Sequence, residues 1–351
     1  MSEKAILVFN SEHDLCLANN DVSFVPPESA CRFSRDCGSI MRFLPDSHRP
    51  ITVWGWDKTI RHRLLLDGAN PSLLPSDGYL QCVRELSHRR TAILCNDFIR
   101  QAFPSRDWMC DAGAVEAFDL ESVRRTVDLY GDTILKSPWS SSGRGLRMVS
   151  STSWTESDLG WCRNIITKQG SVIIEKRSRD LALDFSLQFG VSPDGVHFRG
   201  YSIFRSVHGA YQGNLLASND FMTSRICAYI APAVLEDVRK TVQEFIAEQF
   251  TGRYKGNLGV DMFIARDGQG GYTLNPCVEI NVRNNMGLVA RNLFDSRFSA
   301  QHPGEDGTFQ MSVLYSPDYE ELCRLASGCA EVLTPEFGES SHYVIGILPV
   351  K

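Results

Sequence analysis

Two stretches in the carboxyl-terminal half of the chain decide its fold, and they read Gly259-Val260-Asp261-Met262-Phe263-Ile264-Ala265 and Tyr272-Thr273-Leu274-Asn275-Pro276-Cys277-Val278-Glu279-Ile280-Asn281. Each is a strand-like run, and the turn-forming residues 267–271 lie between them, so the pair predicts a β-hairpin. The turn brings Asp261 opposite Glu279 if a bulge at Pro276, which cannot donate a ladder hydrogen bond, absorbs a small slip in register. Glu279 and Asn281 share one face, because alternate side chains of a strand point to the same side. The sequence therefore predicts two carboxylates and an amide side by side on one sheet.

These three side chains form a candidate metal site. Asp261, Glu279 and Asn281 offer oxygen atoms, and Mg²⁺ is commonly held by one or two carboxylates together with substrate phosphates. A single acid on a strand is more often a solvent-facing polar residue, and two acids can also form a retaining glycosidase pair. The convergence of three such groups among apolar neighbours favours Mg²⁺, with Mn²⁺ as an alternative.

A small-residue loop at 137–145 separates two predicted strands, 133–136 and 146–149. Small residues let backbone N–H groups approach an anion closely, and hydroxyl and guanidinium groups add donors. The spacing does not match a Walker A loop, and an ordinary surface loop is the alternative. The candidate phosphate contacts are Lys136, Ser140, Ser141, Ser142, Gly143 and Arg144.

A third feature is the predicted buried strand at 171–175, which ends in the charged pair Glu175-Lys176. A polar linker then leads to Asp184. A hinge of this kind can read a base edge with backbone groups and a ribose with a carboxylate. The alternative is a surface connection between two subdomains.

In this order, the motifs resemble those of the ATP-grasp superfamily. The matching segments are Ile134-Leu135-Lys136-Ser137-Pro138, Ile173-Ile174-Glu175-Lys176, Gly259-Val260-Asp261 and Glu279-Ile280-Asn281-Val282-Arg283, and they look like the nucleotide and metal motifs of D-alanine–D-alanine ligase and its relatives. The resemblance implies an α/β and α+β ATP-grasp fold. It places an α/β pre-ATP-grasp domain at 1–90, a small subdomain at 91–183, and a large subdomain with the metal site at 184–351.

The resemblance also implies roles for the candidate residues. Lys136 and the loop would contact the phosphates of ATP, Glu175 and Lys176 would frame the adenine, and Asp184 would contact the ribose. Asp261, Glu279 and Asn281 would hold Mg²⁺. Lys136 and Arg283 would be catalytic, with Arg283 facing the transferred phosphoryl group.

The implied reaction is an ATP- and Mg²⁺-dependent ligation. A small carboxylate is activated as an acylphosphate and then joined to an amine, which gives a carbon–nitrogen bond, ADP and phosphate. The alternatives are an ATP-grasp kinase that phosphorylates a hydroxyl, and a nucleotide-binding protein without turnover. The complete metal set favours a catalyst over a binding module.

Two departures from the family pattern concern the large subdomain. The ligase branch often carries an Arg two residues before the metal Asp, where this chain has Gly259, and Arg205 or Arg225 is a candidate replacement. The spacing from Glu175-Lys176 to Asp184 is also longer than in the D-alanine ligases.

Four more residues are weaker candidates. His13, in the polar loop 10–14 after the first predicted strand, is either a substrate contact or a structural histidine. Arg89 and Arg90 are either further phosphate contacts or part of a solvated helix face. His208 lies in a loop that could close over the site.

Composition narrows the remaining possibilities. The chain has 351 residues and a net charge of −6, so a broad basic surface for nucleic acid is not expected. No apolar run approaches the roughly 20 residues that span a bilayer, and residues 1–9 do not form a signal peptide. The eleven cysteines include no C-x2-C pair, which favours reduced thiols. We therefore expect a cytoplasmic protein with small-molecule substrates and no nucleic-acid or membrane partner, and a homo-oligomer is left open.

Local patterns predict most other elements. Strands are expected at 5–9, 51–54, 185–191, 196–205 and 343–350, and helices at 85–103, 120–130 and 232–250. The strand at 5–9 has the composition of a buried strand. Ser153 and Glu156 form a capping-box pattern before a helix that Gly170 ends.

Overall fold

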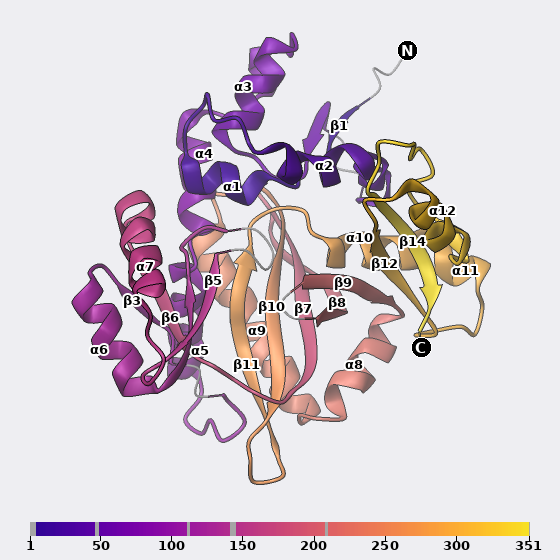
Figure 1. Cartoon of the computed structure of the whole chain (residues 1–351). Helices are drawn as coiled ribbons and strands as arrows, with labels where there is room; N and C mark the ends of the chain where they lie inside the picture. Colours follow the sequence, from indigo (N-terminus) through magenta and orange to yellow (C-terminus); the bar gives the residue numbers. More distant parts are fainter. Residues whose placement is uncertain (1–4, 46–48, 111–112, 141–144, 208–209, 351) are drawn as a thin grey trace.

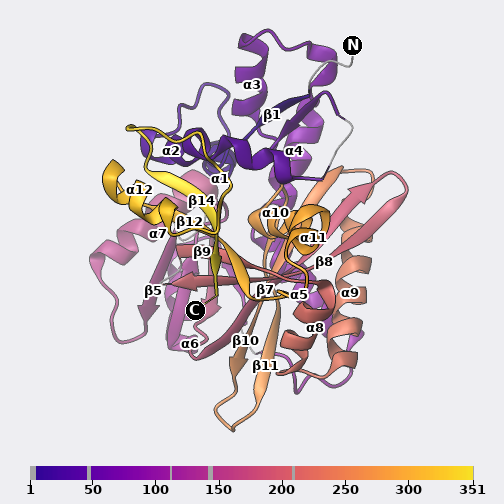
Figure 2. The same cartoon turned by 90° about the vertical axis from the view of Figure 1, so that its right-hand side faces the viewer.

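The computed structural model describes residues 5–350 apart from 46–48, 111–112, 141–144 and 208–209. A large antiparallel sheet occupies the centre of the molecule (Figures 1 and 2). Its eight strands follow the order β11-β10-β7-β8-β9-β12-β14-β13. Their bounds are β7 Leu181–Ser192, β8 Gly195–Val207, β9 Ala210–Leu216, β10 Gly256–Arg266, β11 Tyr272–Asn281, β12 Phe309–Tyr315, β13 Glu331–Val332 and β14 Tyr343–Pro349.

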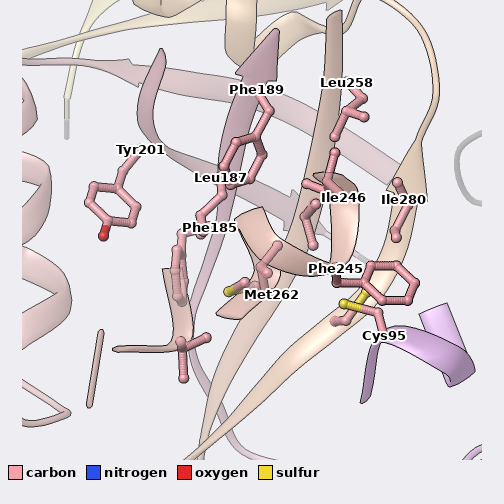
Figure 3. Close-up of a cluster of buried hydrophobic side chains, with 14 of the residues drawn as sticks. Cys95, Phe185, Leu187, Phe189, Tyr201, Phe245, Ile246, Leu258, Met262 and Ile280 are labelled. Carbon is pink, nitrogen blue, oxygen red and sulfur yellow. The ribbon is translucent and has the colours of Figure 1, made fainter. Parts of the chain in front are cut away.

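The two faces of this sheet differ in character because side chains alternate along each strand. On one face, Phe185, Leu187 and Phe189 of β7 pack with Phe245 and Ile246 of the long helix α9 (Pro232–Phe250), as Figure 3 shows. On the other face, β7 presents polar residues, and helix α10 (Met286–Leu293) lies near it. The polar face is the one that carries the candidate metal residues. The remaining helices around this sheet are α8 Asn219–Cys227, α11 Ser299–Gln301 and α12 Tyr319–Ser327.

A smaller antiparallel sheet, with the order β3-β6-β4-β5, lies beside the large one (Figure 1). Its strands are β3 Val115–Ala117, β4 Asp132–Lys136, β5 Leu146–Ser150 and β6 Val172–Lys176, and the helices that cover it are α6 Leu120–Tyr130 and α7 Glu156–Gln169. The capping-box prediction was wrong by two residues, because Thr155 caps α7 and exchanges hydrogen bonds with Asp158. Thr155 has the extended backbone that a cap requires, and Ser153 lies in the preceding turn.

The amino-terminal unit contains a two-stranded parallel sheet of β1 (Ile6–Val8) and β2 (Ile51–Val53). Its helices are α1 His13–Asn19, α2 Glu28–Asp36, α3 Lys58–Leu66 and α4 Asp77–Leu86. The strand at 5–9 was expected to be buried, but Ile6 and Leu7 are each 47% exposed. A sheet of only two strands leaves part of its surface uncovered, and this accounts for the difference.

The helical stretch expected at 85–103 is two helices rather than one. Helix α4 ends at Leu86, and α5 runs from Arg90 to Ala102, with a turn between them. Helix α5 packs against β11 and α9, so Cys95 and Ile99 belong to the core of the large sheet. This break places Arg89 at the start of α5 instead of on a helix surface.

The eleven cysteines form no disulfide in the structure. Burial raises the pKa of the Cys162 thiol to about 11, which keeps it neutral in its apolar cluster. In the described part of the chain, none of the helices has the length and apolar character that crossing a membrane requires.

Candidate active site

The hairpin of β10 and β11 forms as the sequence predicts. Asp261 pairs directly with Glu279, and the register shifts between Asp261 and Phe263, beside the segment that contains Pro276. On the other side of β10, Ser186 of β7 lies opposite Asp261. Ser186, Asp261 and Glu279 therefore form a polar row across the neighbouring strands β7, β10 and β11.

The carboxylates of this row are close enough to influence each other. The Asn281 Nδ2 atom donates to Oδ2 of Asp261 over 2.9 Å. Burial, and then the negative charge of Glu279, raise the pKa of Asp261 to about 7. A cation placed between the two acids would remove this unfavourable pairing, and the donor set consists of oxygen atoms that suit Mg²⁺.

The metal residues do not form a complete shell by themselves. Within the described residues, no group of three His, Cys, Asp or Glu side chains is placed to hold a metal ion. Two acids and one amide fit a Mg²⁺ ion that takes its other ligands from phosphate oxygens and water. The residues present therefore fit a metal that is bound together with a nucleotide.

Arg89 connects three parts of the site, although it was only a weak candidate from the sequence. Its Nη2 atom pairs with Oε1 of Glu279 at 2.9 Å, and its Nη1 atom donates to the Ser137 carbonyl at 2.6 Å and to Ser140 Oγ at 2.8 Å. The side chain is only 6% exposed, and its Nε atom has no hydrogen-bond partner. Arg90, in contrast, lies near the surface and pairs with Glu116. Arg89 thus connects the loop that contains Ser137 and Ser140 to strand β11, which carries Glu279.

Lys136 and Glu175 form a buried ion pair with a distance of 2.7 Å between Nζ and Oε2. They lie at the ends of the adjacent strands β4 and β6, as the sequence predicts for each strand. Their direct contact was not predicted, because it depends on the register of β4 and β6, which are separated in the chain by strand β5 and helix α7. The next residue, Lys176, lies over the ring of Tyr130 at 5.3 Å. The phosphate and adenine roles of these residues stay predictions.

Asp184 lies on the same polar face as Asp261. It is opposite Phe263 on β10, and burial raises its pKa to about 6. Among the described residues no side chain hydrogen-bonds to its carboxylate. The group is therefore available to a ligand hydroxyl, which is what the ribose role requires.

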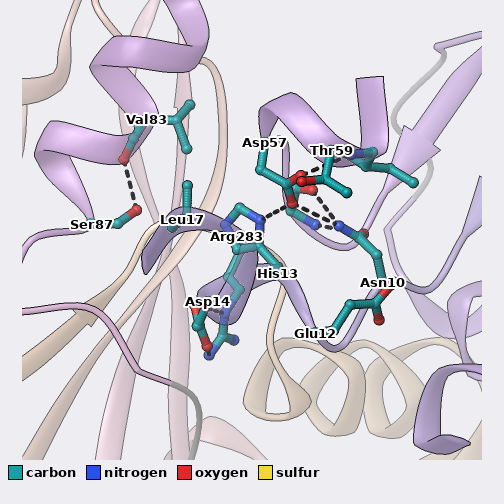
Figure 4. Close-up of polar contacts among 12 residues, drawn as sticks. Asn10, Glu12, His13, Asp14, Leu17, Asp57, Thr59, Val83, Ser87 and Arg283 are labelled. Carbon is teal, nitrogen blue, oxygen red and sulfur yellow. Dashed lines mark hydrogen bonds and ion pairs between the residues drawn. The ribbon is translucent and has the colours of Figure 1, made fainter. Parts of the chain in front are cut away.

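Arg283, which follows strand β11, joins this strand to the amino-terminal unit (Figure 4). Its Nη2 and Nε atoms donate to the two carboxylate oxygens of Asp14 at 2.9 and 3.2 Å. Burial opposes ionisation of Asp14, but the charge and hydrogen bonds of Arg283 outweigh it, so the pKa of Asp14 lies below its ordinary value. Asp14, Ser140, Glu279 and Asn281 line one small cavity, where these residues meet Ser87 from a fourth segment of the chain.

His13 is buried in the amino-terminal unit instead of facing an open site. Its Nδ1 atom lies 2.9 Å from Asp57 Oδ2, and Asn10 donates to the same carboxylate group (Figure 4). Gly55 leaves room for the ring, because a Cβ at this position would lie 2.5 Å from the His13 Cδ2 atom. A structural histidine accounts for these contacts.

The space at Gly259 explains why the family Arg is missing there. A Cβ at Gly259 would lie 2.7 Å from the Asn285 Nδ2 atom, so a longer side chain cannot fit without displacing Asn285. Arg205 and Arg225 are exposed. In the described part of the chain, neither forms an ion pair or hydrogen bond with the candidate metal residues Asp261, Glu279 and Asn281. Arg89 reaches Glu279 from another part of the chain. The sequence contained no local signal for this contact, because residues 85–103 were expected to form one continuous helix.

Five residues of the predicted site, Ser141, Ser142, Gly143, Arg144 and His208, lie outside the described residues. Ser140 is described and is buried beside Arg89.

Asp261→Asn is expected to stabilise the protein at pH 7 in the absence of divalent cations. Because the pKa of Asp261 is raised to about 7 from its ordinary value of 3.8, the native state holds this proton between these two pH values while the unfolded state releases it. The contribution of this group to stability is therefore present at low pH and is lost as pH rises toward 7. The amide avoids that loss, so urea unfolding should show a gain of about 1–3 kcal/mol at pH 7 and almost none at pH 4.

The exposed Asp128 of α6 supplies a matched control, and Asp128→Asn should be neutral at both pH values. Equal effects of the two substitutions would show that Asp261 does not carry a raised pKa.

Comparisons with known proteins agree on the fold. No protein-family model matches the chain, and no curated protein matches its sequence. One similar solved structure is an N5-carboxyaminoimidazole ribonucleotide synthetase bound to ADP, with a TM-score of 0.52, 13% identity, and coverage of 99% of this chain and 91% of that chain. The N5-carboxyaminoimidazole synthetase of Staphylococcus aureus gives a TM-score of 0.51 at 12% identity, covering 99% and 93%.

A third similar structure is D-alanyl-alanine synthetase A from Vibrio cholerae, with a TM-score of 0.46, 12% identity, and coverage of 86% of this chain and 94% of that chain. The two synthetases above match over nearly the whole chain, and they are ATP-grasp enzymes. The chain therefore has the ATP-grasp fold that its motifs predict.

Proposed function

We propose that this chain, which has the ATP-grasp fold, is an ATP- and Mg²⁺-dependent ligase that joins a small carboxylate to an amine. The observation that carries the proposal is the convergence on one cavity of Glu279 and Asn281 from β11, Ser140 from the loop, and Asp14 with its partner Arg283. These groups combine acids for a metal with donors for phosphate oxygens. Such a site suits phosphoryl transfer, in which the protein contributes mainly positioning and charge neutralisation.

The nucleotide would lie between the small sheet and the polar face of the large one. Lys136 and Arg89 supply positive charge to its phosphates, and Ser140 supplies a hydroxyl. The end of β6 at Glu175 and Lys176 would meet the adenine, and Asp184 the ribose. Lys136 and Arg89 would each exchange a carboxylate partner for a phosphate oxygen when ATP binds.

Asp261, Glu279 and Asn281 would hold the metal, which when bound neutralises phosphate charge and orients the terminal phosphate. Without the metal, burial and the charge of Glu279 raise the pKa of Asp261, so two ionised carboxylates side by side are unfavourable here. This cost is expected at a site built to receive a cation.

In the proposed reaction, a carboxylate oxygen of the substrate bonds to the terminal phosphorus of ATP while the bond to ADP breaks. An amine nitrogen then bonds to the acyl carbon, the phosphate group leaves, and the amine loses a proton. Arg283 lies at the end of the metal strand, and its guanidinium would stabilise the negative charge on the transferred group. Asp14 holds the plane of that guanidinium through two hydrogen bonds.

The test is release of ADP and phosphate from MgATP in the presence of pooled amino acids, short peptides and other small acids and amines. Mass spectrometry of an active pool should show a condensed product that has lost one water. A phosphorylated product without condensation would identify a kinase instead, and an absence of ATP consumption with all pools would contradict the proposal.

Replacing Lys136 with Met is expected to weaken ATP binding by about 10- to 100-fold, because a charge-assisted phosphate contact is lost. The same change leaves the buried Glu175 unpaired and will also destabilise the fold. Lys136→Met combined with Glu175→Gln should recover stability without recovering ATP binding. Calorimetric titration with MgATP and urea unfolding measure the two effects separately.

The exposed Lys168 of α7 gives a control, and Lys168→Met should change neither quantity. If the double variant binds ATP as tightly as the unmodified protein, Lys136 is a structural lysine.

A further inference from the structure

A cavity of about 210 Å³ lies beyond the row formed by Ser186, Asp261 and Glu279, where the amino-terminal unit meets the start of β10. The end of β2 and the residues after it, including Trp54 and Trp56, form one wall. The opposite wall is the polar face of the large sheet at Gly190 and Asn257, which pair with each other across β7 and β10. At roughly 30 Å³ per water, the space equals about seven water molecules and suits a small metabolite.

The charged side chains that line this cavity in the described residues are basic. Among the described residues, its lining contains the four basic residues Arg49, Arg199, Lys255 and Arg283, together with His197, and no Asp or Glu. Just outside this lining, Asp194 lies 3.2 Å from His197 and Asp14 lies 2.9 Å from Arg283. The whole chain has more acids than bases, with a net charge of −6, so this lining departs from the average surface. Neighbouring cations repel one another, and a bound anion would remove that cost.

Two of these cations, Arg199 and Lys255, are exposed and have no carboxylate partner among the described residues. Arg199 lies flat over β7, since a Cβ at Gly190 would be only 2.5 Å from its Nε atom. The carbonyl of Lys255 accepts hydrogen bonds from Tyr79 at 2.9 Å and Arg49 at 3.3 Å, which fixes the backbone there.

The cavity adjoins the candidate phosphate site. Val282 lines both cavities, and Arg283 lines the larger one while pairing with Asp14, which lines the smaller one. A molecule bound in the larger cavity therefore lies on one side of Arg283, with the metal residues on the other.

We infer that this cavity binds the non-nucleotide substrate and that this substrate is a small molecule with at least two negative charges, such as a phosphate monoester or a dicarboxylate. The role of this molecule as a substrate rests on the proposed function, but its binding to the cavity does not. One charge would meet Arg199 and Lys255, and a second group would approach Arg283 for reaction. Phosphate monoesters and dicarboxylates both carry anionic groups with several acceptor oxygens. Guanidinium groups bind such groups in a bidentate manner.

The test uses inorganic phosphate, succinate and acetate as probes on the full chain, at pH 8 and constant ionic strength. Phosphate or succinate should raise the melting temperature, while acetate, a single charge, should not. The dianion that gives the larger shift identifies the class, phosphate monoester or dicarboxylate. Arg199→Gln and Lys255→Met should each raise the dissociation constant of that probe at least tenfold.

Two further variants separate this site from the nucleotide site and from general charge effects. Lys136→Met should keep the response to the dianion while losing affinity for MgATP, and Arg199→Gln should do the opposite. Arg124→Gln, on the exposed face of α6, should leave both unchanged. Failure of MgATP binding alone would overturn the proposed function and leave the cavity inference standing.

The inference is overturned if neither dianion stabilises the protein. It is also overturned if the stabilisation persists in both Arg199→Gln and Lys255→Met, or if it disappears in Lys136→Met, because the anion would then occupy the nucleotide site.

Discussion

Glu279→Gln is expected to reduce MgATP-dependent turnover by at least about 10³-fold while leaving the protein folded. Glu279 lies directly opposite Asp261 in the hairpin and lines the cavity shared with Asn281, so it is placed to hold a cation against phosphate oxygens. Glutamine keeps the size of the side chain but removes the charge. Turnover is measured as ADP and phosphate release with an active substrate pool, and Mg²⁺ dependence is measured as the change in ATP affinity on adding the metal.

Glu279→Gln also changes the contact between residue 279 and Arg89, so a control for this structural effect is needed. Glu279 pairs with Arg89 at 2.9 Å, and the remaining amide oxygen can still accept that hydrogen bond, so we expect a stability loss of only about 1–2 kcal/mol. Glu331 is a matched residue, because it pairs with Arg297 at 2.7 Å and is 36% exposed against 32% for Glu279. Glu331→Gln should have a smaller or similar stability effect and normal turnover. Unaltered turnover in Glu279→Gln would contradict the metal role.

Local patterns were sufficient to predict the hairpin and most strands. The turn at 267–271 and the alternation on both sides fix which residues oppose each other, and Pro276 marks where the register shifts. Helix α6 begins after Asp119, which accepts a hydrogen bond from the Ser122 N–H, and stops at Gly131, as its end signals predict. These features depend on residues close in sequence, and a single chain shows them directly.

The charged contacts of the site could not be predicted in the same way. Arg89 reaches Glu279 across 190 positions of sequence, and Arg283 reaches Asp14 across 269. No sequence periodicity links residues so far apart. A long charged side chain can also lie in solvent without a partner, so the sequence does not indicate which contact it makes. The sequence therefore indicated the acids and cations of the site without indicating their pairing.

The pairing itself suggests how the ligand-free protein tolerates so many charges. Lys136, Arg89 and Arg283 each lie beside one carboxylate, from Glu175, Glu279 and Asp14 respectively. Buried charges are costly unless they are paired, so these contacts would hold the proposed phosphate-binding cations in place before a nucleotide arrives. Binding of MgATP would exchange partners, with the metal taking Glu279 and phosphate oxygens taking Arg89. Acidic and basic groups of the site thus stabilise each other until the ligand separates them.

Arg283→Lys is expected to lower turnover by at least about 100-fold with little change in ATP affinity. Arg283 lines the cationic cavity and is held by Asp14 through two hydrogen bonds, so its planar guanidinium has a fixed direction. Lysine preserves the charge but cannot make both contacts at once. The expected loss therefore falls on the reaction step, measured as phosphate release with saturating MgATP, and not on nucleotide binding measured by calorimetry.

The conservative variant and its partner distinguish positioning from structure. Asp14→Asn should lower both turnover and stability, because it leaves a partly buried arginine without its carboxylate. Arg266→Lys, on the exposed end of the same hairpin, is the control and should retain normal turnover. If Arg283→Lys retains more than half of the turnover while Asp14→Asn loses only stability, the Arg283–Asp14 pair serves to join the amino-terminal unit to the large sheet. A loss of turnover in Arg283→Lys with an unchanged melting temperature would instead place the guanidinium at the transferred phosphate.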